Sequence, residues 1–92
     1  MPLAKTLADQ NQIYLVARDD ARNIARSYWV ERSPDLFGYT VVEWHWGRIG
    51  TAGQSRKASF ERAEQAEAWV RQLLRRRDSA PRRIGVSYVV QE

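Results

Sequence analysis

The hydrophobic period of this sequence changes near residue 61, and this change constrains the fold more than any other feature. Upstream, the side chains of residues 25–32 alternate with the period of a half-buried β-strand, and residues 39–46 (YTVVEWHW) give the strongest strand signal. Downstream, apolar residues recur every three or four positions over about residues 62–77, which indicates one face of a helix. The residues of this stripe are Ala63, Ala66, Trp69, Val70, Leu73 and Leu74.

Three further strands complete the predicted order. Residues 12–18 are rich in Ile, Tyr, Leu and Val, residues 55–60 return from a glycine-rich turn, and residues 84–90 follow the helix as a fifth strand. We therefore expect an α+β fold, a small antiparallel β-sheet in the order β-β-β-β-α-β with one helix packed on it. The predicted breaks are the polar cluster 19–23, Pro34 and Gly38, residues 47–54, and residues 78–81 with Pro81.

The length of 92 residues predicts a single domain, with residues 1–11 as a flexible N-terminal lead-in and residues 12–92 as the folded part. No apolar run approaches the roughly 20 residues that a membrane-spanning helix needs, so we expect a cytoplasmic protein without membrane contact. Cysteine is absent from the sequence, which excludes disulfides, thiolate metal sites and cysteine nucleophiles.

Positive charge is concentrated in the second half of the chain. Residues 1–47 carry five basic and six acidic side chains, whereas residues 48–83 carry ten basic and four acidic ones. Most of these cations are arginines, whose planar guanidinium suits bidentate phosphate contacts. This charge asymmetry indicates a polyanionic partner for one side of the molecule. The alternative interpretation is a basic helix end that is only solvated.

Residues 45–57 (HWGRIGTAGQSRK) combine an aromatic side chain, three evenly spaced glycines and three cations. The glycines match neither phosphate-loop pattern, and a strand follows them instead of a helix. They are typical of a tight hairpin turn. Trp46 is expected to stack on a nucleic acid from this hairpin, with Arg48, Arg56 and Lys57 beside it on phosphates.

Two assignments stay open at this point. Trp44 and Trp46 share a strand face with Val42, and we expect Trp44 in the core but Trp46 exposed at the strand end. The arginines that end the helix either join the phosphate site or only complement the helix dipole. These helix-end residues are Arg75, Arg76 and Arg77.

Catalysis and metal binding find little support in the sequence. The single histidine, His45, shares a strand face with Glu43, a pairing that can act as a general base. No serine lies in a nucleophile-elbow context and no further metal ligand stands at a telling spacing. We therefore expect no enzyme activity, no metal and no cofactor.

The stretch WGRIGTAGQ resembles the signature of the WGR domain, which takes its name from the tripeptide found here as Trp46-Gly47-Arg48. The resemblance extends to an upstream strand pair, to Lys57 and Phe60 in the pattern K-x-x-F, and to an alanine-containing amphipathic helix. It covers about residues 12–90 and implies a WGR domain at residues 12–92, in a short standalone form similar to bacterial proteins.

In DNA-damage-dependent poly(ADP-ribose) polymerases this domain helps to bind DNA at breaks and relays that signal to a catalytic domain. There the motif tryptophan packs against the sugar of a terminal nucleotide and neighbouring basic residues meet phosphate. The resemblance assigns that role here to Trp46, with Arg48 nearby.

Two functions follow from the sequence. The first is a non-catalytic nucleic-acid-binding module that prefers DNA ends or breaks, with RNA as an open alternative. The second is a protein-interaction or dimerisation domain that acts through its aromatic sheet face. Salt dependence separates the two, because phosphate binding weakens steeply with ionic strength. The predicted nucleic-acid-binding residues are Trp46, Gly47, Arg48, Arg56, Lys57, Arg75, Arg76 and Arg77.

Overall fold

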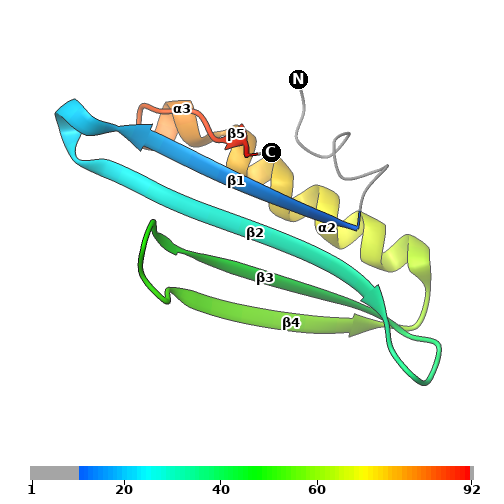
Figure 1. Ribbon diagram of the computed structural model, residues 1–92. Helices are drawn as coiled ribbons and strands as arrows, with labels where there is room; N and C mark the ends of the chain where they lie inside the picture. Colours follow the sequence, from blue (N-terminus) through cyan, green and yellow to red (C-terminus); the bar gives the residue numbers. More distant parts are fainter. Residues whose placement is uncertain (1–10, 92) are drawn as a thin grey trace.

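The computed structural model describes residues 11–91, so the expected lead-in at residues 1–11 lies almost wholly outside the described residues. A curved antiparallel sheet carries one long helix on one of its faces (Figure 1). The α+β fold with the order β-β-β-β-α-β is therefore confirmed. The elements are β1 (Gln12–Asp19), η1 (Asp20–Arg22), β2 (Ile24–Pro34), β3 (Thr40–Arg48), β4 (Gln54–Phe60), α2 (Ala63–Asp78), α3 (Ala80–Arg83) and β5 (Val89–Val90).

The strands lie side by side in the order β4-β3-β2-β1-β5, and each pairs with its neighbours in antiparallel fashion. The first four follow one another as a meander, because short turns join antiparallel strands directly. β5 closes the far edge beside β1 after the chain has returned along α2 (Figure 1).

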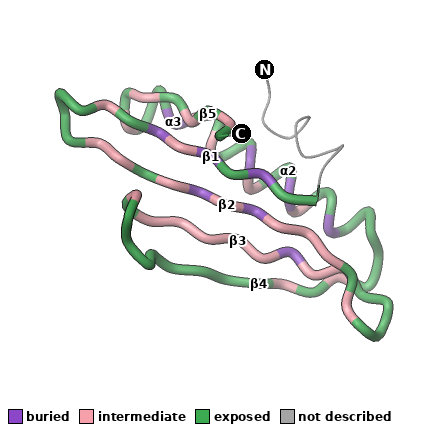
Figure 2. The backbone as a smooth tube through the Cα atoms, in the orientation of Figure 1, coloured by how far each residue is buried: buried purple, intermediate pink, exposed green. Residues whose placement is uncertain are grey.

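Strand alternation gives the sheet two different faces. On the face that we call the helix face, apolar side chains of three strands pack against the apolar stripe of α2. Figure 2 shows the buried positions along the middle of these strands and along one side of α2. The opposite surface, the open face, has no helix upon it among the described residues. The core residues are Ile13, Leu15, Tyr28, Val30, Val42, Ala66, Val70 and Leu74.

The segment after α2 differs from its prediction. A fifth strand was expected over residues 84–90, but only Val89–Val90 pair with β1. Before them, the carbonyl oxygen of Gly85 accepts a 2.9 Å hydrogen bond from Arg22 Nη2, so a distant side chain holds this stretch instead of a ladder. The helix stop near Pro81 is confirmed at Asp78, and Pro81 then sits in the first turn of the short helix α3, where proline is tolerated.

Within residues 11–91, none of the helices has both the length and the apolar composition needed to span a lipid bilayer.

Candidate nucleic-acid interface

The turn between β3 and β4 brings two backbone segments into close contact. A Cβ atom added to Gly47 would lie 2.7 Å from the Cα atom of Gly53, and one added to Gly53 would collide with the carbonyl oxygen of Trp46. Gly53 also has a φ of 64°, in the left-handed region that favours glycine. Thr51 Oγ1 donates a 2.7 Å hydrogen bond to the Arg48 carbonyl oxygen and closes the turn. The Trp-Gly-Arg tripeptide is thus held at the end of the sheet by close backbone packing.

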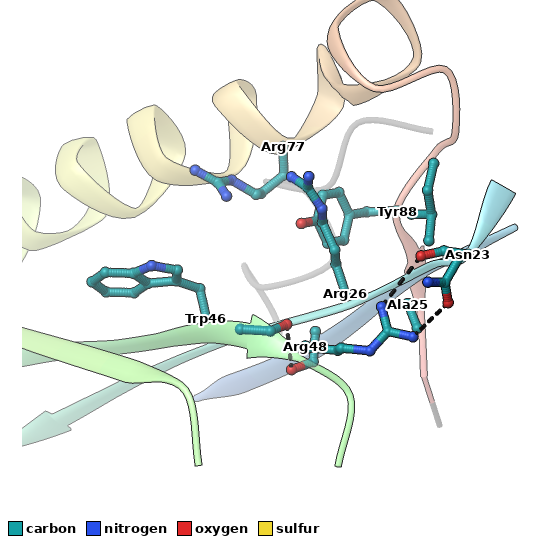
Figure 3. A pocket seen from close by; sticks show the side chains of 10 residues that line it. Asn23, Ala25, Arg26, Trp46, Arg48, Arg77 and Tyr88 are labelled. Carbon is teal, nitrogen blue, oxygen red and sulfur yellow. Dashed lines mark hydrogen bonds between the residues drawn. The ribbon is translucent and has the colours of Figure 1, made fainter. Parts of the chain in front are cut away.

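Trp46 stands between two hollows on the helix face. The first hollow has a volume of about 360 Å³ and lies over the ends of β2 and β3 (Figure 3). Arg26, Arg77 and Tyr88 border its space from three different segments. Its full lining consists of Asn23, Ile24, Ala25, Arg26, Ser27, Trp46, Gly47, Arg48, Arg77 and Tyr88.

The second hollow has a volume of about 370 Å³ and lies between the sheet and the C-terminal half of α2. Three of the four tryptophans of the chain border it. Trp44 and Trp69 meet edge to face with ring centroids 5.6 Å apart, a favourable aromatic arrangement. The lining residues are Tyr28, Trp44, Trp46, Arg56, Trp69, Leu73, Arg76 and Arg77.

Positive charge surrounds both hollows. Five arginines from four different elements line them, and none of the lining residues within the described range 11–91 is acidic. Several cations around one concave surface raise the local concentration of anions. This surface suits a polyanion. The five arginines are Arg26 of β2, Arg48 of β3, Arg56 of β4, and Arg76 and Arg77 of α2.

The guanidinium of Arg48 is tied to the start of β2. Its Nη2 donates a 2.8 Å hydrogen bond to Asn23 Oδ1, and its Nη1 donates a 3.3 Å bond to the Asn23 carbonyl oxygen (Figure 3). Asn23 has a φ of 55°, a left-handed conformation that asparagine adopts more readily than most residues. Arg48 therefore orients the rim of the first hollow besides contributing charge to it.

Arg77 lies over the core residue Tyr28 where both line the second hollow. The Arg77 guanidinium carbon lies 4.2 Å from the centroid of the Tyr28 ring, which is a cation–π contact. Burial raises the pKa of the Tyr28 phenol to about 12, against the opposing effect of the Arg77 charge. Tyr28 is therefore neutral at physiological pH.

The structure brings six of the eight predicted binding residues to the two hollows, namely Trp46, Gly47, Arg48, Arg56, Arg76 and Arg77. It does not bring the other two there. Lys57 lies opposite Glu43 in the β3–β4 register, on the open face, and Arg75 is exposed on α2 without lining either hollow. The role of all eight in binding stays a prediction.

The two tryptophans of β3 differ from their expected burial. Trp44 was expected in the core and Trp46 exposed, but both are half-buried and both pack against the core cluster. The reason is their shared strand face with Val42, which directs both indoles toward α2.

Ten lining residues of the two hollows were absent from the sequence-based site, and three of them show what the sequence could and could not reveal. Arg26 had a usable signal, because it shares the alternation of Tyr28 in β2 and so belongs to the helix face. Asn23 and Tyr88 had none, since their positions depend on the turn after η1 and on the path of the chain beyond α3.

His45 lies on the open face, away from the hollows. Its ring stacks on Trp29 with centroids 4.7 Å apart, and its Nε2 lies 3.6 Å from Glu43 Oε2. Among residues 11–91, no group of three or more His, Cys, Asp or Glu side chains is arranged to hold a metal ion.

Fold and hollow together describe a small sheet-and-helix module that presents a Trp-Gly-Arg hairpin end, and the comparison with protein families agrees with this description. The WGR domain family matches residues 11–81, and the chain belongs to this family. The family is non-catalytic and serves as a nucleic-acid-binding module in poly(ADP-ribose) polymerases.

The chain is also similar to the uncharacterized protein y4dW of Sinorhizobium fredii (strain NBRC 101917 / NGR234), with 38% identity over 66 residues. The match covers 72% of this chain and 32% of the relative, so the chain spans about a third of that protein's length.

Proposed function

We propose that this chain is a non-catalytic nucleic-acid-binding module that binds DNA at ends or breaks through the surface around Trp46. We call this area the Trp46 surface. It consists of Trp46 together with Arg26, Arg48, Arg56, Arg76 and Arg77.

One observation carries the proposal: five arginines and a half-buried indole line two adjoining hollows, and no acidic side chain of residues 11–91 lines either of them. Neutralising phosphates releases condensed counterions and supplies most of the affinity of sequence-independent binding. Arginine forms paired hydrogen bonds to phosphate oxygens, which lysine cannot match in geometry.

The position of Trp46 supports a preference for ends. Inside a continuous duplex, each sugar and each base pair is covered by the next nucleotide. At an end, the last sugar and the last base pair are uncovered on one side. An indole at the tip of a sheet, between cations that hold the last phosphates, can pack against such a freed surface. The membership in the WGR family points to the same use of the motif tryptophan.

A second candidate function is protein association through the open face. Tyr14, Trp29 and His45 face one another across three neighbouring strands and form an aromatic row. Tyr14 is 40% exposed, and the row offers apolar area to a partner.

Titrations of the purified chain against blunt duplex, nicked duplex, closed circular duplex, single-stranded DNA and RNA test the proposal. We expect binding that weakens with salt, with a log–log slope of roughly −3.6 if four phosphates are contacted at about −0.9 each. Ends and nicks should bind more tightly than closed circles. The absence of binding to all five ligands at low salt would contradict the proposal, and salt-independent self-association would favour the second candidate.

A further inference from the structure

The two hollows beside Trp46 differ in chemistry, although they share Trp46 and Arg77. The first is lined by backbone, by Asn23 and by three arginines, which suits phosphate and sugar. The second is walled by indole rings, Leu73 and the Tyr28 ring, with its arginines beside them. A flat apolar group fits the second hollow better than a phosphate does.

Buried polar atoms strengthen this distinction. Among residues 11–91, four buried side-chain polar atoms have no hydrogen-bond partner. One is His45 Nε2 on the open face, and the other three, Tyr28 Oη, Trp69 Nε1 and Arg77 Nε, belong to residues that line the second hollow. Buried polar groups in folded proteins are almost always hydrogen-bonded, so three such atoms around one hollow indicate a partner from outside the chain. Indole and guanidinium N–H groups only donate, and the partner must therefore carry acceptor atoms.

From these observations we infer that the second hollow is a nucleobase pocket, which takes the base of one unpaired nucleotide at a DNA end. A nucleobase is flat, stacks on indole rings and carries carbonyl and ring-nitrogen acceptors at its edge. Arg56 and Arg76, which are exposed and line the same hollow, can bind the phosphate of that nucleotide. The inference rests on the proposed function and narrows its ligand to ends with an unpaired base.

Arg77 controls access to the pocket. Its guanidinium now covers the Tyr28 ring at 4.2 Å, and the Tyr28 hydroxyl beneath has almost no solvent exposure. A phosphate held by Arg56 and Arg76 draws the Arg77 guanidinium outward, which opens the ring and the hydroxyl to the base. Bases inside a duplex are paired and stacked, so only an overhang, a gap or a single strand supplies such a group without the cost of unpairing.

The test uses a hairpin duplex with one open end and the complete chain. Three probes end in a blunt pair, in one unpaired thymidine, and in one abasic residue at the position of that thymidine; the overhang is placed on the 3′ strand in one set and on the 5′ strand in another. Fluorescence anisotropy gives the dissociation constant of each probe. The abasic probe matches the charge and the sugar of the thymidine probe, so their ratio isolates the base.

We expect the thymidine probe to bind at least about fivefold more tightly than the abasic probe, the lower limit for one stacked base. Trp69→Phe keeps an aromatic ring but removes the indole N–H, and Leu73→Phe narrows the same hollow from α2. Each should reduce the thymidine-to-abasic ratio. Trp29→Phe, on the open face, is the matched control and should keep the wild-type ratio.

Equal affinity for the thymidine and abasic probes would overturn the nucleobase pocket and leave the proposed function standing. Failure of all three probes to bind would contradict the proposed function itself. Free thymidine 5′-monophosphate is titrated in parallel. If the monophosphate binds as tightly as the thymidine probe, the second hollow is a site for soluble nucleotides, and the inferred role of the hollow at DNA ends is overturned.

Discussion

The two faces of the sheet are built from the same strands, yet they differ in charge and in burial. The helix face carries the core and, at its β3–β4 end, five arginines around two hollows that are lined by no carboxylate of the described residues. The open face carries Glu31, Glu43 and Lys57 in one cross-strand row and Tyr14, Trp29 and His45 in the next. On the open face, acidic side chains thus stand in register with the lysine.

Sequence neighbours separate because strand side chains alternate. Trp46 faces the helix whereas His45 faces away, and Arg56 lines the second hollow whereas Lys57 lies opposite Glu43 on the open face. The positive charges that are neighbours in the sequence are thus divided between the two faces of the sheet. Each neighbouring pair is a matched test of this difference.

The largest expected difference concerns stability. Leu15 is fully buried on the helix face, and its neighbour Tyr14 is 40% exposed on the open face. Leu15→Ala should lower the free energy of unfolding by about 2–5 kcal/mol, because it leaves a cavity in a small core. Tyr14→Ala should cost less than about 1 kcal/mol. Urea unfolding followed by circular dichroism measures both, and similar losses would show that the open face is covered in solution.

Trp46→Ala should weaken binding to duplex ends by about 1–3 kcal/mol, the usual effect of losing one aromatic stack. Trp29→Ala removes another half-buried indole from the open face and should leave the affinity unchanged. Affinities are measured by anisotropy at a temperature where circular dichroism shows both variants folded. An equal loss of affinity for duplex ends and for closed circles would show that Trp46 stacks on DNA without a preference for ends.

A smaller difference is expected between two adjacent cations. Arg56→Gln should weaken DNA binding and reduce the magnitude of the log–log salt slope by about 0.9, the contribution of one phosphate contact. Lys57→Gln removes the same formal charge from the open face and should leave the slope unchanged. Arg75→Gln provides a second control on α2. Equal changes for Arg56→Gln and Lys57→Gln would show that total charge, and not the hollow, governs affinity.

The smallest effect at neutral pH concerns the Tyr28 hydroxyl. Since this hydroxyl is buried and has no hydrogen-bond partner in the part of the chain that the structure describes, Tyr28→Phe should change the free energy of unfolding by less than about 1 kcal/mol at pH 8. Its pKa is raised to about 12 by burial, so above pH 10 the unfolded chain loses this proton while the folded chain retains it. Stability is therefore fully present below pH 10 and falls as the pH rises toward 12.

Chemical denaturation at a series of pH values compares the wild type with Tyr28→Phe. The variant should lack the part of the decline above pH 10 that Tyr28 causes. Identical pH profiles for the two proteins would show that the phenol is not buried in solution.

Much of the fold could be predicted because the local signals agree with the tertiary arrangement. The alternation in residues 25–32 and the apolar stripe of residues 62–77 identified β2 and α2 to within a few residues at their ends. The fifth strand was overestimated, because its β-branched residues favour a strand but Arg22 binds the Gly85 carbonyl and holds the chain off the ladder. A hydrogen bond between residues 63 positions apart cannot be predicted from the local hydrophobic periodicity.

The site could be predicted only in part. The hairpin and its tryptophan follow from the motif, and alternation alone could have separated Lys57 from Arg56. The joining of Arg26 with Arg77 and Tyr88 required the strand register and the placement of α2 against the sheet, which no local pattern contains.

The four tryptophans can report directly which face of the sheet binds the nucleic acid. Each indole N–H gives its own signal in a ¹⁵N–¹H spectrum of the labelled chain, and Trp29 alone lies on the open face. On titration with a duplex end, the signals of Trp44, Trp46 and Trp69 should shift in proportion to binding, while that of Trp29 stays in place. If the Trp29 signal shifts while the Trp46 signal does not, the nucleic acid binds to the open face, and binding at the Trp46 surface is contradicted.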